Sequence, residues 1–256
     1  MSILKRIQEK KRINKEMNDV LAIKYMVLAH LSELIKHREQ INEDLFEVTA
    51  FLLDEIGDAL SAIVALKKDH LKSSIMISRY ILEDCVNLHY IYKKDSERRA
   101  LNYRAFPAKE LLSRMEMYEG DDERIKKEIP RVKERLEKYS PSGSNQNHWD
   151  GLSIKKIMSD LGFDDIYQNW YVRMSSYTHP QYRGGKIKAS DKGEYVEFLK
   201  NMVFKDLNLP ILESLRAINR KFDLLEGGVV ISNYPKENST LVFSINEHRE
   251  PSGGKK

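Results

Sequence analysis

The chain has 256 residues, enough to bury a sizeable core in one helical domain or in two small ones. Its formal net charge is only +4, so the molecule as a whole is not the strongly basic object that duplex-binding proteins usually are. The single cysteine, Cys85, excludes a disulfide within the chain and a cysteine-based zinc site.

The N-terminal segment, residues 1–41, is predicted to be a basic helical arm, because apolar residues recur at helical spacing toward its end. Its first sixteen residues carry a cluster of basic side chains: Lys5, Arg6, Lys10, Lys11, Arg12 and Lys15. Such a charge run is usually a solvated helix face, and an anionic partner is the alternative. The segment lacks the apolar core of a signal peptide. No stretch approaches the roughly 20 apolar residues of a membrane span, so we expect a cytoplasmic protein without a membrane partner.

Residues 42–226 are predicted to form the helical core domain. Asn42 caps a helix whose apolar residues, from Leu45 to Ile63, recur at helical spacing. The next helix, from about 71 to 94, carries apolar residues on almost every side. A helix with this pattern is buried on most sides, so we expect it at the centre of the bundle.

The chain becomes more polar beyond this central helix. Asp95 or Ser96 is expected to cap a fourth helix, which Pro107 interrupts or restarts. The charged stretch 121–139 is predicted to be a peripheral helix. The run 140–147 is rich in Ser, Gly and Asn and predicts a loop that is either exposed or locally disordered.

The second half of the chain completes the predicted architecture. We expect a short capped helix over 153–162, a helix over 164–178 and a last helical region over 193–225. Alternating residues within 227–246 predict a small β-hairpin, and 247–256 a disordered tail. The predicted fold class is therefore mainly α, a bundle of about seven to nine helices with a C-terminal β-hairpin.

One basic residue falls on a face that should be apolar. On a regular helix from 164 to 178, Ile166, Trp170, Met174 and Tyr177 form the buried stripe, and Arg173 projects close to Ile166. This predicts that Arg173 lies at the edge of the buried face. A guanidinium in that place needs an acidic partner or an anionic ligand.

The central helix offers ionisable partners. Arg79 and Glu83 have i,i+4 spacing and are expected to touch, and Asp84 lies beside them. One interpretation is a buried ion network that fixes how the helices pack. The other is that this network supports a catalytic site by joining Arg173 to Glu83 or Asp84.

His179 precedes Pro180, and a residue before proline is pushed out of the α region, so the helix should end at about Thr178. The imidazole is then free to fold back toward Arg173. The hydroxyl residues Ser176 and Tyr177 lie between the two, and a basic, glycine-containing loop follows with three candidate substrate-binding residues: Tyr182, Arg183 and Lys186. Such a group suits phosphate chemistry. A histidine that merely caps the helix C-terminus is the alternative.

Other motifs are weaker. His148 and Trp149 follow the polar loop and are candidates to line a cleft, with Trp149 anchoring the chain to the core. The Glu-x-x-His pairs of carboxylate-bridged metal bundles are absent, and so are the P-loop, Rossmann and hydrolase-elbow patterns. We therefore expect neither a metal nor a cofactor.

The chain resembles a bacterial helical family of unknown function, DUF5677, over roughly residues 45–225. The resemblance rests on an ordered combination of short motifs: Arg79-Tyr80-Ile81-Leu82-Glu83, Tyr90, Arg98, Tyr103, His148-Trp149, Ser153-Ile154, and Tyr171 to Pro180. That family has no established activity, so the resemblance implies a fold more than a function.

A looser resemblance links Arg173 and His179 to the HEPN-type ribonucleases, helical proteins of toxin–antitoxin and antiviral systems. Five residues separate the Arg and the His, as in that family, but Met174 stands where the family typically has Asn, Asp or His. The resemblance implies metal-independent RNA cleavage through the 2′-hydroxyl, with His179 as general acid and base and Arg173 stabilising the charged phosphorane. It also implies a homodimer.

Three hypotheses of function follow. The first is a HEPN-like endoribonuclease, or a degenerate relative, acting in a toxin or antiviral defence system. The second is a non-catalytic helical module that binds a partner protein or a nucleic acid. The third is a small-molecule-binding bundle with a closed apolar cavity lined by Tyr80, Tyr90 and Trp170.

Overall fold

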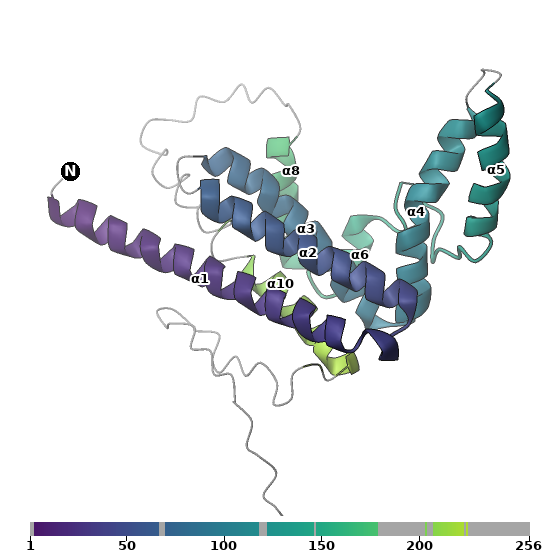
Figure 1. The fold of residues 1–256 in the computed structure, drawn as a ribbon. Coiled ribbons are helices and arrows are strands. Elements are labelled where there is room, and N and C mark those ends of the chain that lie inside the picture. The colour runs from purple at the N-terminus through teal and green to yellow at the C-terminus, as the bar shows by residue number, and fades with distance from the viewer. Residues whose placement is uncertain are drawn as a thin grey trace, which may run out of the picture.

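The computed structural model describes residues 3–66, 70–117, 122–145, 147–178, 203, 207–222 and 224. Every regular element within these ranges is helical, so the predicted mainly α fold is confirmed for this part of the chain (Figure 1). The β-hairpin expected within 227–246 and the tail expected at 247–256 lie outside the described residues.

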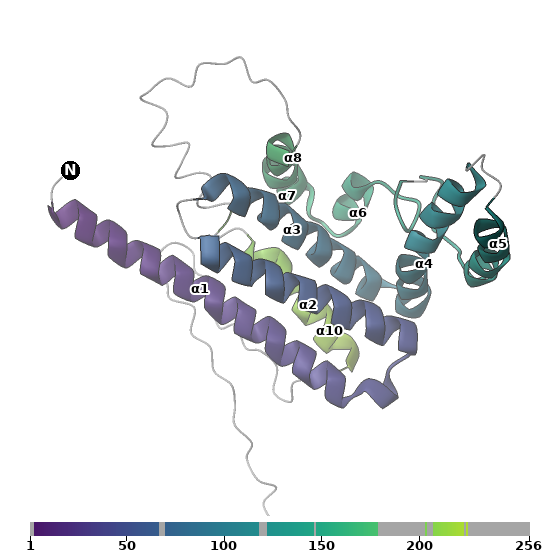
Figure 2. The same ribbon diagram turned by 45° about the horizontal axis from the view of Figure 1, so that its top comes forward.

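Four helices form the body of the bundle. The long helices α1 (Ile3–Lys36), α2 (Glu43–Leu66) and α3 (Leu71–Lys93) follow one another in antiparallel directions, and α10 (Asn208–Phe222) packs on α3 and on α1 (Figures 1 and 2). The predicted cap of α2 is confirmed, because the Leu45 amide donates to the Asn42 side-chain oxygen over 3.2 Å.

Helix α3 is the central element, as its sequence predicted. Ile75, Ile81, Leu82 and Leu88 are completely buried, and the helix contacts α2, α4, α6, α8 and α10. A helix in contact with so many neighbours must bury residues on most of its faces, which explains the absence of a single apolar stripe.

The second half of α1 also belongs to the core. Four apolar residues of this half are buried against the bundle: Val20, Ile23, Val27 and Leu34. The boundaries expected between an N-terminal arm, a core domain and the C-terminal segments stay predictions.

Helices α4 (Ser96–Glu116) and α5 (Glu123–Leu136) form a hairpin that projects from one end of the bundle (Figure 1). Asp95 occupies the N-cap of α4 with a positive φ of 50°. Pro107 lies inside α4, so the predicted interruption at this residue is wrong. Proline removes one helical hydrogen bond, but α4 packs against α2 and α5, and these contacts keep it continuous.

The short helix α6 (Ile154–Asp160) has the predicted boundaries. Ser153 caps it by accepting a hydrogen bond from the Lys156 amide over 3.2 Å. Gly162 follows its end with a φ of 76°, a conformation that glycine adopts without steric cost.

The helix predicted over 164–178 is present but not regular. It consists of α7 (Asp164–Ile166), a π-helical turn η2 (Tyr167–Tyr171) and α8 (Val172–Thr178). A π turn holds more residues than an α turn, so it changes which side chains of the following helix face the bundle.

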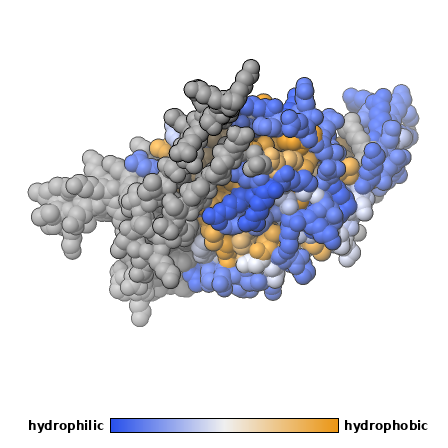
Figure 3. Space-filling model, turned by 90° about the horizontal axis from the view of Figure 1, so that it is seen from below, coloured by the Kyte–Doolittle hydropathy of each residue, from blue (hydrophilic) through white to orange (hydrophobic). Residues whose placement is uncertain are grey.

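Within the described ranges, no helix combines the length and the apolar character needed to cross a membrane. Seen from below, apolar residues lie in the middle of the described surface, with hydrophilic residues between and beside them (Figure 3).

Candidate functional site

Three polar residues form a stripe along α3. Arg79, Glu83 and Asn87 are spaced four residues apart, so their side chains leave the same face of the helix. The predicted contact is confirmed: Arg79 Nε donates to Glu83 Oε1 over 2.9 Å. Both side chains are largely shielded, with exposed fractions of 19% and 29%. This pair is therefore screened less by solvent than an ordinary surface ion pair.

Tyr171 joins this stripe from the π turn. Its hydroxyl donates to Glu83 Oε1 over 3.0 Å and accepts from Arg79 Nη2 over 3.3 Å. The Arg79 guanidinium also lies 5.3 Å from the centre of the Tyr171 ring, within range of a cation–π contact. Burial, reinforced by the Glu83 charge, raises the pKa of Tyr171, so the phenol keeps the proton that it donates.

Arg173 does not lie where the regular-helix projection placed it. It is exposed, so its predicted position at the edge of the buried face is wrong. Ile166 and Met174 are buried as predicted, but the π turn between them invalidates a projection at constant rotation per residue. Arg79 and Tyr171 donate to Glu83, so Tyr171 makes the contact with this carboxylate that we expected of Arg173.

The other residues of the predicted phosphate site lie beyond the described part of the chain. These are His179, Tyr182, Arg183 and Lys186, together with the side chains of Ser176 and Tyr177. The approach of His179 to Arg173 therefore stays a prediction.

Asp84, the third predicted member of the network, is influenced by acidic residues on two helices. Burial, together with the charges of Glu55 on α2 and Glu83, raises the pKa of this carboxyl to about 7. The same three carboxyls also raise the pKa of Tyr103 on α4, after a larger effect of burial. Glu55 and Glu83 therefore act together on this face of α3, where Asp84 keeps its proton up to near-neutral pH.

The loop between α5 and α6 is fixed to the bundle by a carboxylate that sequence reasoning missed. Asp150 is completely buried and accepts hydrogen bonds from the Ser142 amide at 3.1 Å, Asn102 Nδ2 at 3.2 Å and the Tyr90 hydroxyl at 3.1 Å. Arg98 Nη1 lies 3.5 Å from it. Four donors from α3, α4 and the loop make the buried charge tolerable and fix this end of the loop. Ser142, Ser144 and Asn147 are exposed, as one of the two expectations for this run predicted.

Two glycines allow the ends of this loop to cross. Gly151 has a φ of 71°, and a Cβ on Gly151 or Gly143 would collide with the backbone of the other. The Gly143 amide donates to the Asp150 carbonyl over 3.0 Å, and the Asn145 amide to the Gly151 carbonyl over 2.7 Å. This close crossing determines where His148 and Trp149 lie.

Trp149 anchors the loop to α3, as predicted. It is only 4% exposed, and its indole N–H donates to Asn87 Oδ1 over 2.9 Å. His148 lies next to it, and its Nδ1 accepts a hydrogen bond from the Asp150 amide over 3.3 Å. Burial lowers the pKa of His148 to about 4, against a smaller opposing effect of Asp150, so the imidazole is neutral at physiological pH.

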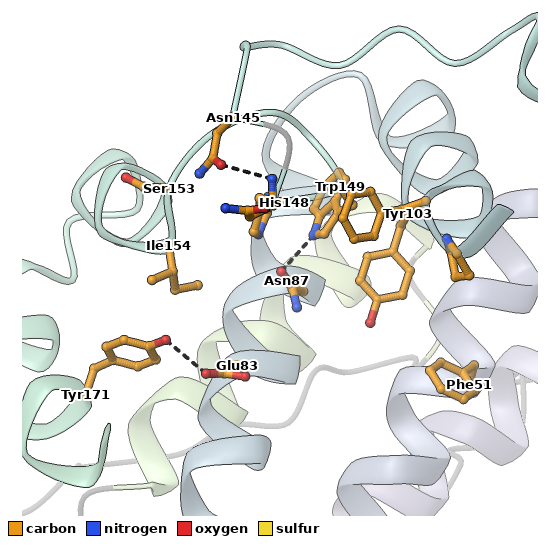
Figure 4. Close-up of a pocket in the computed structure, with 13 residues that line it drawn as sticks. Phe51, Glu83, Asn87, Tyr103, Asn145, His148, Trp149, Ser153, Ile154 and Tyr171 are labelled. Atoms are coloured by element: carbon orange, nitrogen blue, oxygen red, sulfur yellow. Dashed lines mark hydrogen bonds between the residues drawn. The ribbon is translucent and has the colours of Figure 1, made fainter. Parts of the chain in front are cut away.

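These residues surround an open cleft of about 610 Å³. Glu83 and Asn87 project from α3 at its base, His148 lies above Asn87, and Tyr171 faces Tyr103 across the opening (Figure 4). The prediction that His148 and Trp149 line a cleft is confirmed.

The cavity expected from Tyr80, Tyr90 and Trp170 is not this cleft, because none of the three residues lines it. Tyr80 is 62% exposed, and Tyr90 is buried beneath the loop with its hydroxyl on Asp150. The closed apolar cavity expected under the third hypothesis therefore does not coincide with this cleft.

The comparisons with known proteins support the family assignment. Residues 46–194, more than half of the chain, match the model of the family of unknown function DUF5677. The chain belongs to this family. The matched segment contains every residue that lines the cleft, and also Arg173 and His179. No curated protein matches the chain, and no solved structure matches it.

Proposed function

We propose that the chain is a metal-independent endoribonuclease of the HEPN type, or a degenerate relative of one. Its reaction centre would be Arg173 together with His179. The exposure of Arg173 carries the proposal, because an exposed guanidinium on α8 is accessible to a phosphodiester from solvent. The spacing of Arg173 and His179 supports it.

Tyr171 supports the proposal because it fixes the N-terminal end of α8. Its hydrogen bonds to Glu83 and Arg79 join the π turn to α3, two residues before Arg173. A catalytic group must be held by rigid neighbours to keep its geometry, and this junction supplies such a support.

In the proposed reaction the 2′-oxygen of a ribose attacks the adjacent phosphorus. His179 takes the proton of the 2′-hydroxyl as the new O–P bond forms, and a proton returns to the 5′-oxygen as its bond to phosphorus breaks. The products are a 2′,3′-cyclic phosphate and a free 5′-hydroxyl. Arg173 stabilises the additional negative charge of the phosphorane between these steps.

The test is cleavage of single-stranded RNA by the full-length chain in the presence of EDTA. His179→Ala and Arg173→Ala should each lower the rate at least about 100-fold, the scale of general acid–base and charge stabilisation. His70→Ala and Arg124→Ala, at exposed positions elsewhere, are the matched controls and should leave the rate unchanged. Substrate with 2′-deoxyribose at the cleaved position should stay intact. Undiminished cleavage by the His179→Ala variant would overturn the proposal.

Two further parts of the proposal concern the assembly and the cell. A homodimer is supported by exposed apolar side chains on two helices that contact each other, Tyr80 on α3 and Val172 on α8. Analytical ultracentrifugation should detect the dimer. A role in growth arrest or antiviral defence, in the cytoplasm, requires that expression slows growth and that His179→Ala relieves this effect.

A further inference from the structure

The cleft between α3, α4, α6 and the π turn has the size and wall chemistry of a small-molecule site. Its volume of about 610 Å³ falls within the roughly 300–1,000 Å³ of ligand pockets. Aromatic rings from four different parts of the chain line it: Phe51, Tyr103, Trp149 and Tyr171. Walls of this kind favour a flat ring system, which gains stacking and edge contacts on several sides.

Asn87 presents hydrogen-bond donors to this space. The indole N–H of Trp149 is a donor only, so the atom of Asn87 that it contacts must be the amide oxygen. That contact fixes the orientation of the amide and leaves its NH₂ group at the opposite end, on a residue that lines the cleft.

His148 adds a second donor. Because Nδ1 accepts the Asp150 amide hydrogen, the proton of the neutral imidazole is on Nε2. His148 lines the cleft together with Asn87, and Figure 4 shows the two side chains next to each other.

Glu83 is the acceptor of the site. The hydrogen bonds from Arg79 Nε and Tyr171 both end on Oε1. A carboxylate has about four lone-pair positions, so Glu83 can accept further bonds. It lies one helical turn from Asn87 on the same face of α3, which places an acceptor beside donors along one line.

From this arrangement we propose that the cleft binds a purine or pyrimidine base. The Watson–Crick edge of the base would lie against Glu83 and Asn87, and its ring would lie between the aromatic walls. A base edge pairs N–H donors with a carbonyl or ring-nitrogen acceptor, complementary to this side-chain set. Guanine fits best, since its N1–H and 2-amino groups suit a carboxylate and its O6 suits an amide or imidazole donor. Glu83 is the acidic side chain among the lining residues, and its charge disfavours a phosphate in the cleft itself.

This base site is separate from the proposed cleavage site, because neither Arg173 nor His179 is among the residues that line the cleft. Two sources can supply the base: a free nucleoside, or a nucleotide of an RNA chain whose backbone stays outside the cleft. Both offer the same ring and the same edge.

The first experiment titrates the full-length chain with guanosine, inosine, adenosine, uridine and cytidine by calorimetry, with Trp149 fluorescence as a second signal. Guanosine should bind most tightly, and inosine, which lacks the 2-amino group, about tenfold more weakly. If no nucleoside binds below millimolar concentration, the proposal is overturned. The ligand comparison uses the unaltered protein, so it does not depend on the folding of any variant.

The second experiment uses near-isosteric variants. Glu83→Gln removes half of the acceptor capacity. Asn87→Asp keeps the oxygen that Trp149 contacts but loses the NH₂ donors. Each should weaken guanosine binding about tenfold or more, while Glu55→Gln, outside the cleft, should change it less than about twofold. Urea midpoints verify that the variants fold. Folded variants with unchanged affinity would overturn the proposal.

A third arm separates the two sources and the two proposals. If the natural ligand is a base within RNA, a short single-stranded RNA that contains guanine should bind more tightly than guanosine and compete with it. A free ligand predicts that only the nucleoside binds. Binding that persists in Arg173→Ala and His179→Ala shows the cleft site whether or not the chain cleaves RNA. Cleavage of RNA by a chain that binds no nucleoside would support the proposed ribonuclease and overturn the base site in the cleft.

Discussion

The Tyr171 hydroxyl donates to Glu83 Oε1 over 3.0 Å, and this bond joins the π turn before α8 to the middle of α3. It connects two segments 88 residues apart, each of which carries residues of a proposed site. The position of α8, and so of Arg173, depends on this contact and on the Arg79 guanidinium that supports it.

Tyr171→Phe should weaken this junction without removing the ring. The variant loses a charge-assisted hydrogen bond to a carboxylate, so we expect the free energy of unfolding to fall by about 1 to 2 kcal/mol in urea titrations. Tyr25→Phe is the control, because Tyr25 is exposed on α1. It should lower stability by less than about 0.5 kcal/mol. Equal effects of the two substitutions would show that the Tyr171 hydroxyl contributes nothing.

Asp150→Asn tests the anchor of the loop before α6. The amide keeps one acceptor oxygen, replaces the other with an NH₂ donor and cannot balance the charge of Arg98, and the site is closed to water, so we expect a loss of about 3 kcal/mol. Asp160→Asn removes a carboxylate from an exposed i,i+4 pair with Lys156 and should cost only about 0.3 to 0.5 kcal/mol. Urea unfolding followed by tryptophan fluorescence measures both. Similar midpoints for the two variants would contradict a structural role of Asp150.

Local signals in the sequence predicted the helices well. The cap of α2 by Asn42, the cap of α6 by Ser153 and the burial of α3 follow from residue types and spacing within one element. The contact of Arg79 with Glu83 follows equally from i,i+4 spacing. These features need no knowledge of the neighbouring helices.

The features that the sequence did not reveal depend on several elements at once. The π turn at Tyr167–Tyr171 carries no proline or glycine to mark it. In the sequence, Asp150 looks like an ordinary loop aspartate. Two of its donors, Tyr90 and Arg98, precede it by 60 and 52 positions, and local patterns do not reveal such distant partners. Only the assembled bundle shows that this carboxylate is buried, or that Glu83 and Asn87 share a cleft with His148.

Gly151→Ala tests the crossing of the loop. Alanine at this position is strained by the positive φ, and its Cβ collides with the Gly143 backbone, so the loop must move. Gly162→Ala is a matched control, because Gly162 has a similar φ of 76° but no heavy atom within 4 Å of an added Cβ. The control should cost about 1 kcal/mol, from backbone strain alone. Gly151→Ala should cost more in urea and shift the Trp149 emission to longer wavelength. Equal costs would mean that the crossing is not tight in solution.

Asp84 predicts a pH dependence of stability. Its pKa of about 7 in the folded protein exceeds the usual 3.8, so between these values the folded state holds a proton that the unfolded state has lost. The stabilisation is therefore complete below about pH 4 and disappears as the pH rises to 7. Asp84→Asn cannot ionise and avoids this loss.

The measurement compares the free energies of unfolding of Asp84→Asn and the unaltered chain at pH 5 and pH 8. Relative to the unaltered chain, the variant should gain roughly 1 to 3 kcal/mol on going from pH 5 to pH 8. His148, whose lowered pKa of about 4 makes stability fall as the pH drops below about 6.5, is present in both proteins and cancels. Asp54→Asn, an exposed change on α2, is the control and should show no such gain. If the Asp84→Asn difference is also independent of pH, then the carboxyl is ionised in the folded protein throughout this range, and burial beside Glu55 and Glu83 does not raise its pKa.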